Sequence, residues 1–154
     1  MQFLSPIQVV AMDTIPAEAR SPHKSKQLPV VLVVDDERVI ADTLSIILSK
    51  SGFAVQTAYD ASSALEIAGV IPPHLLLSDV MMGPGMDGTQ LAMELMNVYP
   101  DCKVILFSGH AATHDLLEKA REMGHNFTLL NKPLHPADLL ACIQNSLIAA
   151  PALA

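Results

Sequence analysis

The sequence predicts an α/β fold, a (βα)5 doubly wound five-stranded parallel sheet. Five short apolar runs indicate the strands, at residues 30–34, 54–58, 74–78, 103–107 and 127–130. Each run is followed by a stretch with helical spacing of its apolar residues. Because the crossover between parallel strands is right-handed, this alternation covers both faces of the sheet with helices. The first, third and fourth runs are the most continuously apolar and are expected to be the central strands.

Apolar residues three or four positions apart predict four of the helices. They are Ile40, Leu44, Ile47 and Leu48; Leu91, Leu95 and Val98; Ala112, Leu116, Ala120 and Met123; and Leu140, Ile143 and Leu147. A shorter, Ala-rich helix is expected around residues 62–68. Gly52, Gly69 and Gly124 stand where helix C-caps are expected, because glycine readily adopts the left-handed conformation found there.

The chain is expected to contain one domain with a segment on either side. Residues 1–29 contain four Pro and mixed charge without sustained periodicity, so they predict a flexible N-terminal leader, with a short apolar piece at residues 7–12. Residues 30–148 are long enough for one packed core. Residues 149–154 predict a short C-terminal tail that cannot form an output domain.

Composition and charge argue against several classes of protein. A net charge of −7 and an aromatic content of 4% do not suit nucleic-acid binding, which favours basic and stacking surfaces. No uncharged run is long enough to span a bilayer, and the N-terminus lacks the features of a signal peptide. Cys102 and Cys142 lack paired spacing, which predicts reduced thiols. We therefore expect a cytoplasmic protein that binds neither nucleic acid nor membranes.

Polar residues stand where four of the predicted strands end. Asp35 and Asp36 follow the first run, Asp79 the third, Ser108 the fourth and Lys132 the fifth. The carboxyl ends of parallel strands meet at one edge of the sheet, where such folds bind ligands. Taken singly, each residue has an ordinary explanation as a helix cap, a turn former or a solvated loop residue. Their convergence from four strands favours a common site.

Together these residue types suit metal-assisted phosphoryl transfer. Clustered carboxylates bind hard cations, and Mg²⁺ favours carboxylates, waters and phosphate oxygens. A carboxylate can attack phosphorus to give an aspartyl phosphate. A lysine and a metal would neutralise the phosphoryl charge, and a hydroxyl would bond a phosphoryl oxygen. A bound cation would also explain why three consecutive acids, DDE, follow the apolar run VVLVV.

Four motifs carry a resemblance to a known family: VLVVDDE, LLLSDVMMGPGMDG, VILFSGH and NKPL. In this order and at this spacing the chain resembles a response-regulator receiver domain of bacterial two-component signalling, of the single-domain, chemotaxis-regulator-like kind. The resemblance covers residues 30–148 and implies the flavodoxin-like strand order 2-1-3-4-5. It implies a signalling protein that receives a phosphoryl group and signals by docking, not an enzyme beyond its own phosphorylation and dephosphorylation.

The resemblance also implies roles for the residues at the strand ends. Asp79 is the expected phosphoacceptor, Lys132 pairs with the phosphoryl group and Ser108 is the switch hydroxyl. The expected cofactor is Mg²⁺, for which Mn²⁺ can substitute. Its expected ligands are Asp36, Asp79, the backbone carbonyl of Met81 and, through water, Asp35.

Other family positions are expected to tune or support the site. Met81 is bulky enough to hinder a water attacking the aspartyl phosphate, and Gly109 leaves room for the phosphodonor. His110 is a third tuning position, whose side chain titrates near neutrality. Pro133 is expected to follow a cis Lys–Pro bond.

Two features depart from the family pattern. Gly83 is an extra residue in the loop after Asp79, before Pro84. Leu129 stands three residues before Lys132, where the family often has the aromatic residue that moves on activation. The nearest aromatic, Phe127, lies two residues earlier.

The expected partners are a sensor histidine kinase or histidine phosphotransfer protein and a downstream protein target, with the chain a monomer or weak homodimer. The departures leave one alternative open, a pseudo-receiver that binds partners without phosphorylation. An aspartate-nucleophile phosphatase is disfavoured because Val80 and Met81 follow the acceptor where such enzymes need a second Asp. A flavin-binding module is disfavoured because the acids after the first strand would repel a phosphate.

Overall fold

Five parallel strands form one sheet at the centre of the structure, a computed structural model that describes residues 27–109 and 113–148. The strands are β1 (Val30–Val34), β2 (Ala54–Ala58), β3 (Leu75–Asp79), β4 (Lys103–Ser108) and β5 (Thr128–Asn131). Their order is β2-β1-β3-β4-β5, and each neighbouring pair is parallel. The predicted fold class and strand order are confirmed, and β1, β3 and β4 are central, as expected.

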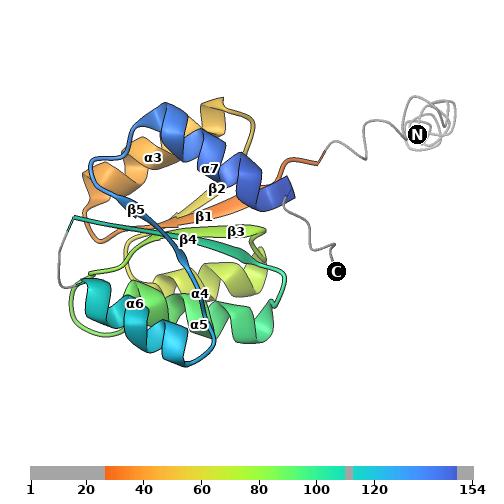
Figure 1. Cartoon of the computed structure of the whole chain (residues 1–154). Helices are drawn as coiled ribbons and strands as arrows, with labels where there is room; N and C mark the ends of the chain where they lie inside the picture. Colours follow the sequence, from red (N-terminus) through yellow and green to blue (C-terminus); the bar gives the residue numbers. More distant parts are fainter. Residues whose placement is uncertain (1–26, 110–112, 149–154) are drawn as a thin grey trace, which may run out of the picture.

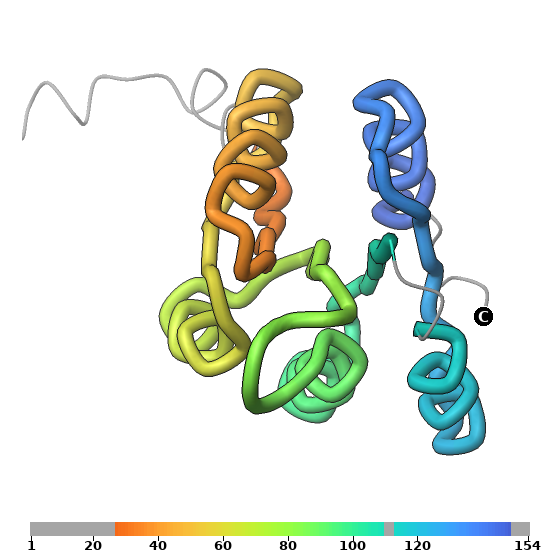
Figure 2. The backbone as a smooth tube through the Cα atoms, turned by 90° about the vertical axis from the view of Figure 1, so that its left-hand side faces the viewer, coloured from red at the N-terminus to blue at the C-terminus, as the bar shows by residue number. Residues whose placement is uncertain are grey.

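Helices cover both faces of this sheet (Figure 1). Helices α3 and α7 lie on one face, whereas α4, α5 and α6 lie on the other, and Figure 2 shows the same two layers from the side. The helices are α3 (Arg38–Lys50), α4 (Ala61–Val70), α5 (Gly88–Val98), α6 (Thr113–Glu122) and α7 (Pro136–Ile148).

Alternating side chains on the strands build one core on each face. On β1, Val31 and Val33 join the core under α3 and α7, while Leu32 and Val34 join the core under α4 and α5. This period of two is the geometry of a strand buried on both sides. Small residues let α4 lie close to the sheet, because its buried positions are all alanine: Ala61, Ala64 and Ala68.

Helix α5 begins with a capping box that fixes the end of the loop after β3. The Asp87 carboxylate accepts hydrogen bonds from the backbone N–H groups of Thr89 (2.7 Å) and Gln90 (3.0 Å). The Gln90 side-chain oxygen accepts in turn from the Asp87 N–H at 2.9 Å. These bonds satisfy donors that the first turn of a helix leaves unpaired.

Several strand ends lie one residue beyond their predicted positions. Strands β3 and β5 begin and end one residue later than predicted, and β4 continues through Ser108. The reason is the ladder register, which pairs Asp79 with Phe107 and Ser108 with Asn131. Asp79 and Ser108 are therefore the last residues of strands, with the restricted backbone of a sheet.

The prediction that Gly69 ends its helix is wrong. Helix α4 continues to Val70, and the extended residue Ile71 ends it. Pro72 and Pro73 follow, and a residue before proline avoids the helical conformation. Gly52 and Gly124 do follow α3 and α6, with φ angles of 98° and 94°.

Two apolar residues of the helical pattern, Val98 and Met123, lie outside the core. Val98 is 65% exposed and Met123 is 67% exposed. Tyr99 packs on the core near the end of α5 in place of Val98, and its hydroxyl donates to the Ala68 carbonyl at 3.0 Å. Met123 lies just beyond the last residue of α6.

The predictions for the leader before residue 27, for residues 110–112 and for the tail after residue 148 fall outside the described residues. Among residues 27–109 and 113–148, none of the helices has the length and the apolar character needed to cross a membrane. Both cysteines are free thiols, Cys102 buried and Cys142 half-buried.

Candidate functional site

Three carboxylates from two strand ends meet at the carboxyl edge of the sheet. Asp35 and Asp36 follow β1, and Asp79 ends the neighbouring strand β3. One oxygen from each lies within 4.8 Å of the others, close enough for one metal ion to reach all three. Asp35 is fully buried and Asp79 is 4% exposed, whereas Asp36 is exposed. The cluster therefore faces solvent on the side of Asp36.

Lys132 brings one positive charge to these acids from the end of β5. Its Nζ lies 3.3 Å from Asp79 Oδ2 and 3.4 Å from Asp35 Oδ2, with Glu37 Oε1 at 3.7 Å. The Lys132 N–H donates to the Ser108 carbonyl, and the Lys132–Pro133 peptide bond is cis. One ammonium facing three clustered carboxylates leaves the site short of positive charge.

The electrostatics of the site reflect this shortage. Burial, with a smaller contribution from the nearby Asp79 carboxylate, outweighs the lowering effects of the Glu37 N–H and Lys132 and raises the pKa of Asp35 to about 6. Burial also raises the pKa of Asp79, outweighing the lowering by Lys132 and the Met81 backbone. Burial lowers the pKa of Lys132, but the two carboxylates outweigh it and the pKa is raised. A cation beside the acids would favour their charged forms.

One buried oxygen has no partner in the described structure. It is Oδ1 of Asp79. A buried carboxylate oxygen without a hydrogen bond is costly unless a ligand or ion satisfies it. The Asp35 oxygens, by contrast, are occupied by the Glu37 N–H at 2.9 Å and by Lys132. The residues present therefore fit a hard cation or a charged ligand at Asp79.

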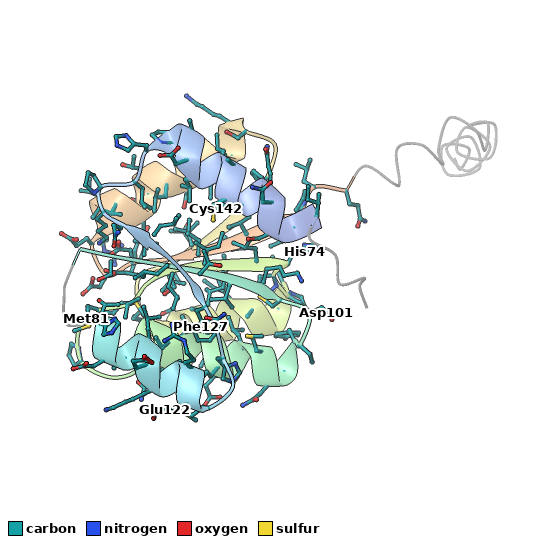
Figure 3. All side chains as sticks on the ribbon, viewed as in Figure 1. His74, Met81, Asp101, Glu122, Phe127 and Cys142 are labelled. Carbon is teal, nitrogen blue, oxygen red and sulfur yellow. The ribbon has the colours of Figure 1, made fainter. Side chains whose placement is uncertain are left out.

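The loop after β3 also touches the cluster. The backbone N–H of Gly83, the residue that lengthens this loop, donates to Asp36 Oδ2 at 3.0 Å. This bond orients an otherwise exposed carboxylate toward the loop. Met81, in the same loop, is 37% exposed, and it lies at the same edge of the sheet (Figure 3).

Ser108 ends β4, the strand beside β3, and lies near a residue that sequence reasoning missed. Its hydroxyl shares a 2.5 Å hydrogen bond with the Thr113 hydroxyl, and both residues are buried. Thr113 opens α6, so this bond ties the sheet edge to that helix. Gly109 follows, and a Cβ there would lie 3.6 Å from Lys132 Cβ, an ordinary contact. His110 lies outside the described residues.

Gly88 is the second residue that the sequence did not single out. A Cβ at this position would lie 2.2 Å from the backbone oxygen of Asp79. Its N–H donates to the Val80 carbonyl at 2.8 Å, so α5 begins directly against the end of β3. In the sequence, the one sign of this close approach is a glycine at the first position of a helix that Asp87 already caps.

Leu129 and the aromatic residue Phe127 lie in different surroundings near β5. Leu129 is part of β5 and half-buried. Phe127 lies before the strand, packs on the core under α4 and α5, and stacks on His125 with 5.4 Å between ring centroids. The Phe107 ring does lie beside a site residue, with its centroid 5.2 Å from Lys132 Nζ.

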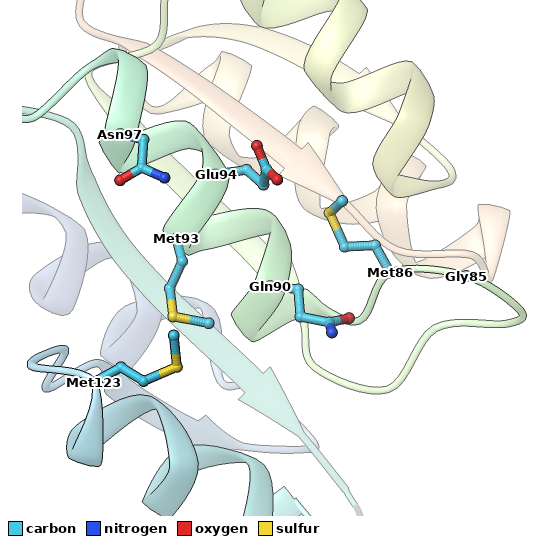
Figure 4. A pocket seen from close by; sticks show the side chains of 7 residues that line it. All are labelled: Gly85, Met86, Gln90, Met93, Glu94, Asn97 and Met123. Atoms are coloured by element: carbon cyan, nitrogen blue, oxygen red, sulfur yellow. The ribbon is translucent and has the colours of Figure 1, made fainter.

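A separate hollow of about 630 Å³ lies beside α5 (Figure 4). Met86, Met93 and Met123 line it together with Gln90, Glu94, Asn97 and Gly85. In Figure 4 the Met93 and Met123 side chains approach one another from α5 and from beyond α6. None of its lining residues belongs to the acidic cluster, and a single carboxylate gives it no evident chemistry.

Comparison with known proteins shows the family to which the chain belongs. Residues 31–144 match the family model of the response regulator receiver domain. The chain belongs to that family. The receiver protein CpdR of Brucella abortus is 33% identical over 120 residues, which cover 78% of this chain and 98% of that protein.

Solved receiver structures resemble the whole sheet and its helices. The signal receiver domain of an HD domain-containing protein from Pseudomonas fluorescens superposes with a TM-score of 0.73 and 30% identity, covering 79% of this chain and 96% of that one. A CheY-like receiver domain protein from Methanospirillum hungatei gives 0.71 and 29%, covering 79% and 95%. Receiver domains of this family are modules of two-component signalling rather than ordinary enzymes.

Proposed function

We propose that this receiver accepts a phosphoryl group on Asp79 and signals through protein contacts. The observation that carries the proposal is the Asp79 carboxylate itself. It ends β3, one of its oxygens is buried without a partner, and the other lies 3.3 Å from the Lys132 ammonium. A carboxylate presented in this way can act as a nucleophile.

We place Mg²⁺, or Mn²⁺ in its stead, at the acidic cluster. Asp36, Asp79 and the backbone carbonyl of Met81 would bind it directly, and Asp35 would bind through water. The ion would neutralise negative charge on the carboxylates and on the incoming phosphoryl group. The unpartnered Asp79 oxygen and the three converging carboxylates support this assignment.

In the proposed transfer, an Asp79 oxygen attacks the phosphorus of a phosphohistidine on a sensor kinase or phosphotransfer protein. The new O–P bond forms as the P–N bond to the imidazole breaks, and the imidazole leaves with the electron pair. Lys132 neutralises phosphoryl charge, and the Ser108 hydroxyl bonds a phosphoryl oxygen. Met81, Gly109 and His110 would set how quickly water hydrolyses the aspartyl phosphate, which releases inorganic phosphate and restores the Asp79 carboxylate.

Output would follow from the link between Ser108 and α6. When the hydroxyl turns toward a phosphoryl oxygen, its bond to Thr113 must change, and Thr113 is the first residue of α6. The structure could then shift toward a form that docks a target. Because Leu129 stands where the family usually has an aromatic residue, the bond between Ser108 and Thr113 would provide more of the coupling between phosphorylation and target docking.

The test is incubation with acetyl phosphate and Mg²⁺, followed by intact mass spectrometry. Wild-type protein should gain one phosphoryl group, and the gain should need Mg²⁺. Asp79→Asn should gain nothing, whereas Asp101→Asn, an exposed acid at the opposite edge (Figure 3), should behave as wild type. A folded wild-type protein that gains no mass would contradict the proposal and favour the pseudo-receiver alternative.

A further inference from the structure

Exposed apolar residues collect at the amino edge of the sheet, opposite to the acidic site. Among the described residues, nine large hydrophobic side chains are exposed, and five of them lie at this edge. We call these five the amino-edge patch: Leu28, Val70, Ile71, Val98 and Ile148. They are 53%, 80%, 37%, 65% and 73% exposed. Concentrations of exposed apolar surface of this kind mark places where something binds.

One hollow of about 440 Å³ lies at the same edge, and the patch residue Val98 lines it. Its apolar lining residues join the turns after α4 and α5 to the last turn of α7: Pro72, Pro73, Val98, Tyr99, Pro100 and Leu147. His74, Asp101, Cys102 and Lys103 complete the lining. Val70 and Ile71 precede its two prolines, and Ile148 follows Leu147. The 3.0 Å bond from the Tyr99 hydroxyl to the Ala68 carbonyl holds the ends of α4 and α5 together.

The chain enters the sheet at the wall of this hollow. The Val30 N–H donates to Nδ1 of His74, a lining residue, at 2.9 Å, and the His74 N–H donates to the Val30 carbonyl. Leu28 lies two residues before this contact. Figure 3 shows His74 and Asp101 at the edge where β1 begins, and Met81 at the other edge.

The chain carries a matching apolar stretch just upstream. Residues 3–12 read FLSPIQVVAM, with six large apolar side chains and no charge, so burying them would desolvate no ion. All five charged residues of the leader fall within residues 13–26. This charged segment of 14 residues can extend to roughly 45 Å, while five strands span roughly 20 Å, so the apolar stretch can reach any part of the patch.

We propose that residues 3–12 dock on the amino-edge patch of the same chain. A tether of this length gives an effective concentration in the millimolar range, above the concentration of a second copy in a dilute sample. Residues 149–154 come after α7 in the sequence, but AAPALA offers only one large apolar side chain. The docked segment would cover the amino edge and leave the Asp79 edge open, so this inference does not depend on the proposed phosphorylation.

Paramagnetic relaxation in the full-length chain tests the proposal. A nitroxide is attached at Ser5→Cys in a Cys142→Ser background. Cys102 stays unlabelled, because it is 3% exposed and burial raises the pKa of its thiol to about 11. The amide signals of Val98 and other patch residues should lose most of their intensity. Val39 is equally apolar but lies in the first turn of α3, at the carboxyl edge of the sheet, and should keep its signal.

Two further measurements show whether the segment on the amino-edge patch belongs to the same chain. Val98→Asp should restore the lost signals, and Val39→Asp, at a residue 78% exposed, should not. In a mixture, one sample carries the nitroxide without ¹⁵N and the other carries ¹⁵N without the nitroxide. The ¹⁵N signals of this mixture should show no loss of intensity. Full intensity at the patch in the labelled chain would overturn the proposal, and loss in the mixture would overturn it in favour of a second copy.

Discussion

At the scale of single residues, the backbone carbonyl of Asp79 leaves no space for a side chain at position 88. A Cβ there would meet this oxygen at 2.2 Å and the Val80 Cα at 2.9 Å, both backbone atoms that cannot rotate away. Gly88→Ala should therefore move α5 or the end of β3 and lower the free energy of unfolding by about 1–3 kcal/mol, the usual effect of overpacking. Urea unfolding measures this change.

Gly69→Ala is the matched control for that substitution. Gly69 lies inside α4, and a Cβ there would have nothing within 4 Å. Replacement by alanine should raise the free energy of unfolding by up to about 1 kcal/mol, because glycine is the poorer helix former. Equal effects at the two positions would show that helix propensity, rather than the contact with Asp79, decides the outcome at Gly88.

The site residues that the sequence could predict are those that stand at strand ends. Once the apolar runs are recognised as parallel strands, the residues that follow them must share one edge, and Asp35, Asp79 and Lys132 do so within 3.4 Å. Thr113 and Gly88 could not be predicted in this way. Their roles depend on how closely a helix approaches the end of a strand, and no local pattern encodes that distance.

At the scale of elements, the start of α5 is fixed more firmly than the start of α3. Asp87 accepts two backbone N–H groups, whereas Glu37, the N-cap of α3, makes no side-chain capping bond. Asp87→Ala should lower the free energy of unfolding by about 1 kcal/mol, the usual value of an N-cap. Glu37→Ala should change it much less, because Glu37 is exposed and its 3.7 Å ion pair with Lys132 is solvated.

Thermal or urea unfolding of both variants checks this difference. The opposite order would mean that the contact between Glu37 and Lys132 stabilises the fold more than the capping box does. Because α5 begins just after the loop that carries Met81 and Gly83, Asp87→Ala should also loosen this loop, which faster hydrogen exchange at the Gly83 N–H would report.

The sequence predicted the helices and strands well and the residues at which they end less well. Strand positions were right to within one residue because apolar runs between charged or turn residues leave little freedom. The end of α4 was wrong because a pair of prolines, rather than Gly69, stops that helix. Val98, although it follows the helical spacing, is exposed for a tertiary reason, since the larger Tyr99 packs on the core near the end of α5.

For the molecule as a whole, charge at the acidic site makes stability depend on pH. The pKa of Asp35 rises from 3.8 to about 6 on folding without a metal ion. Between these values the folded state holds a proton that the unfolded state has lost, so the contribution of Asp35 to stability is present below pH 4 and is lost as pH rises through 6. The full loss is on the order of 3 kcal/mol, because each pKa unit is worth 1.36 kcal/mol.

Other acids titrate over the same range, so the measurement compares metal-free wild type with Asp35→Asn by urea unfolding from pH 4 to pH 7.5. The wild type should lose stability relative to the variant up to about pH 6.5 and then stay level. Mg²⁺ should raise the free energy of unfolding of the wild type more at pH 7.5 than at pH 5, because a cation favours the ionised carboxylates. A pH-independent difference between the two proteins would mean that Asp35 is already charged in the metal-free fold, held by Lys132 alone.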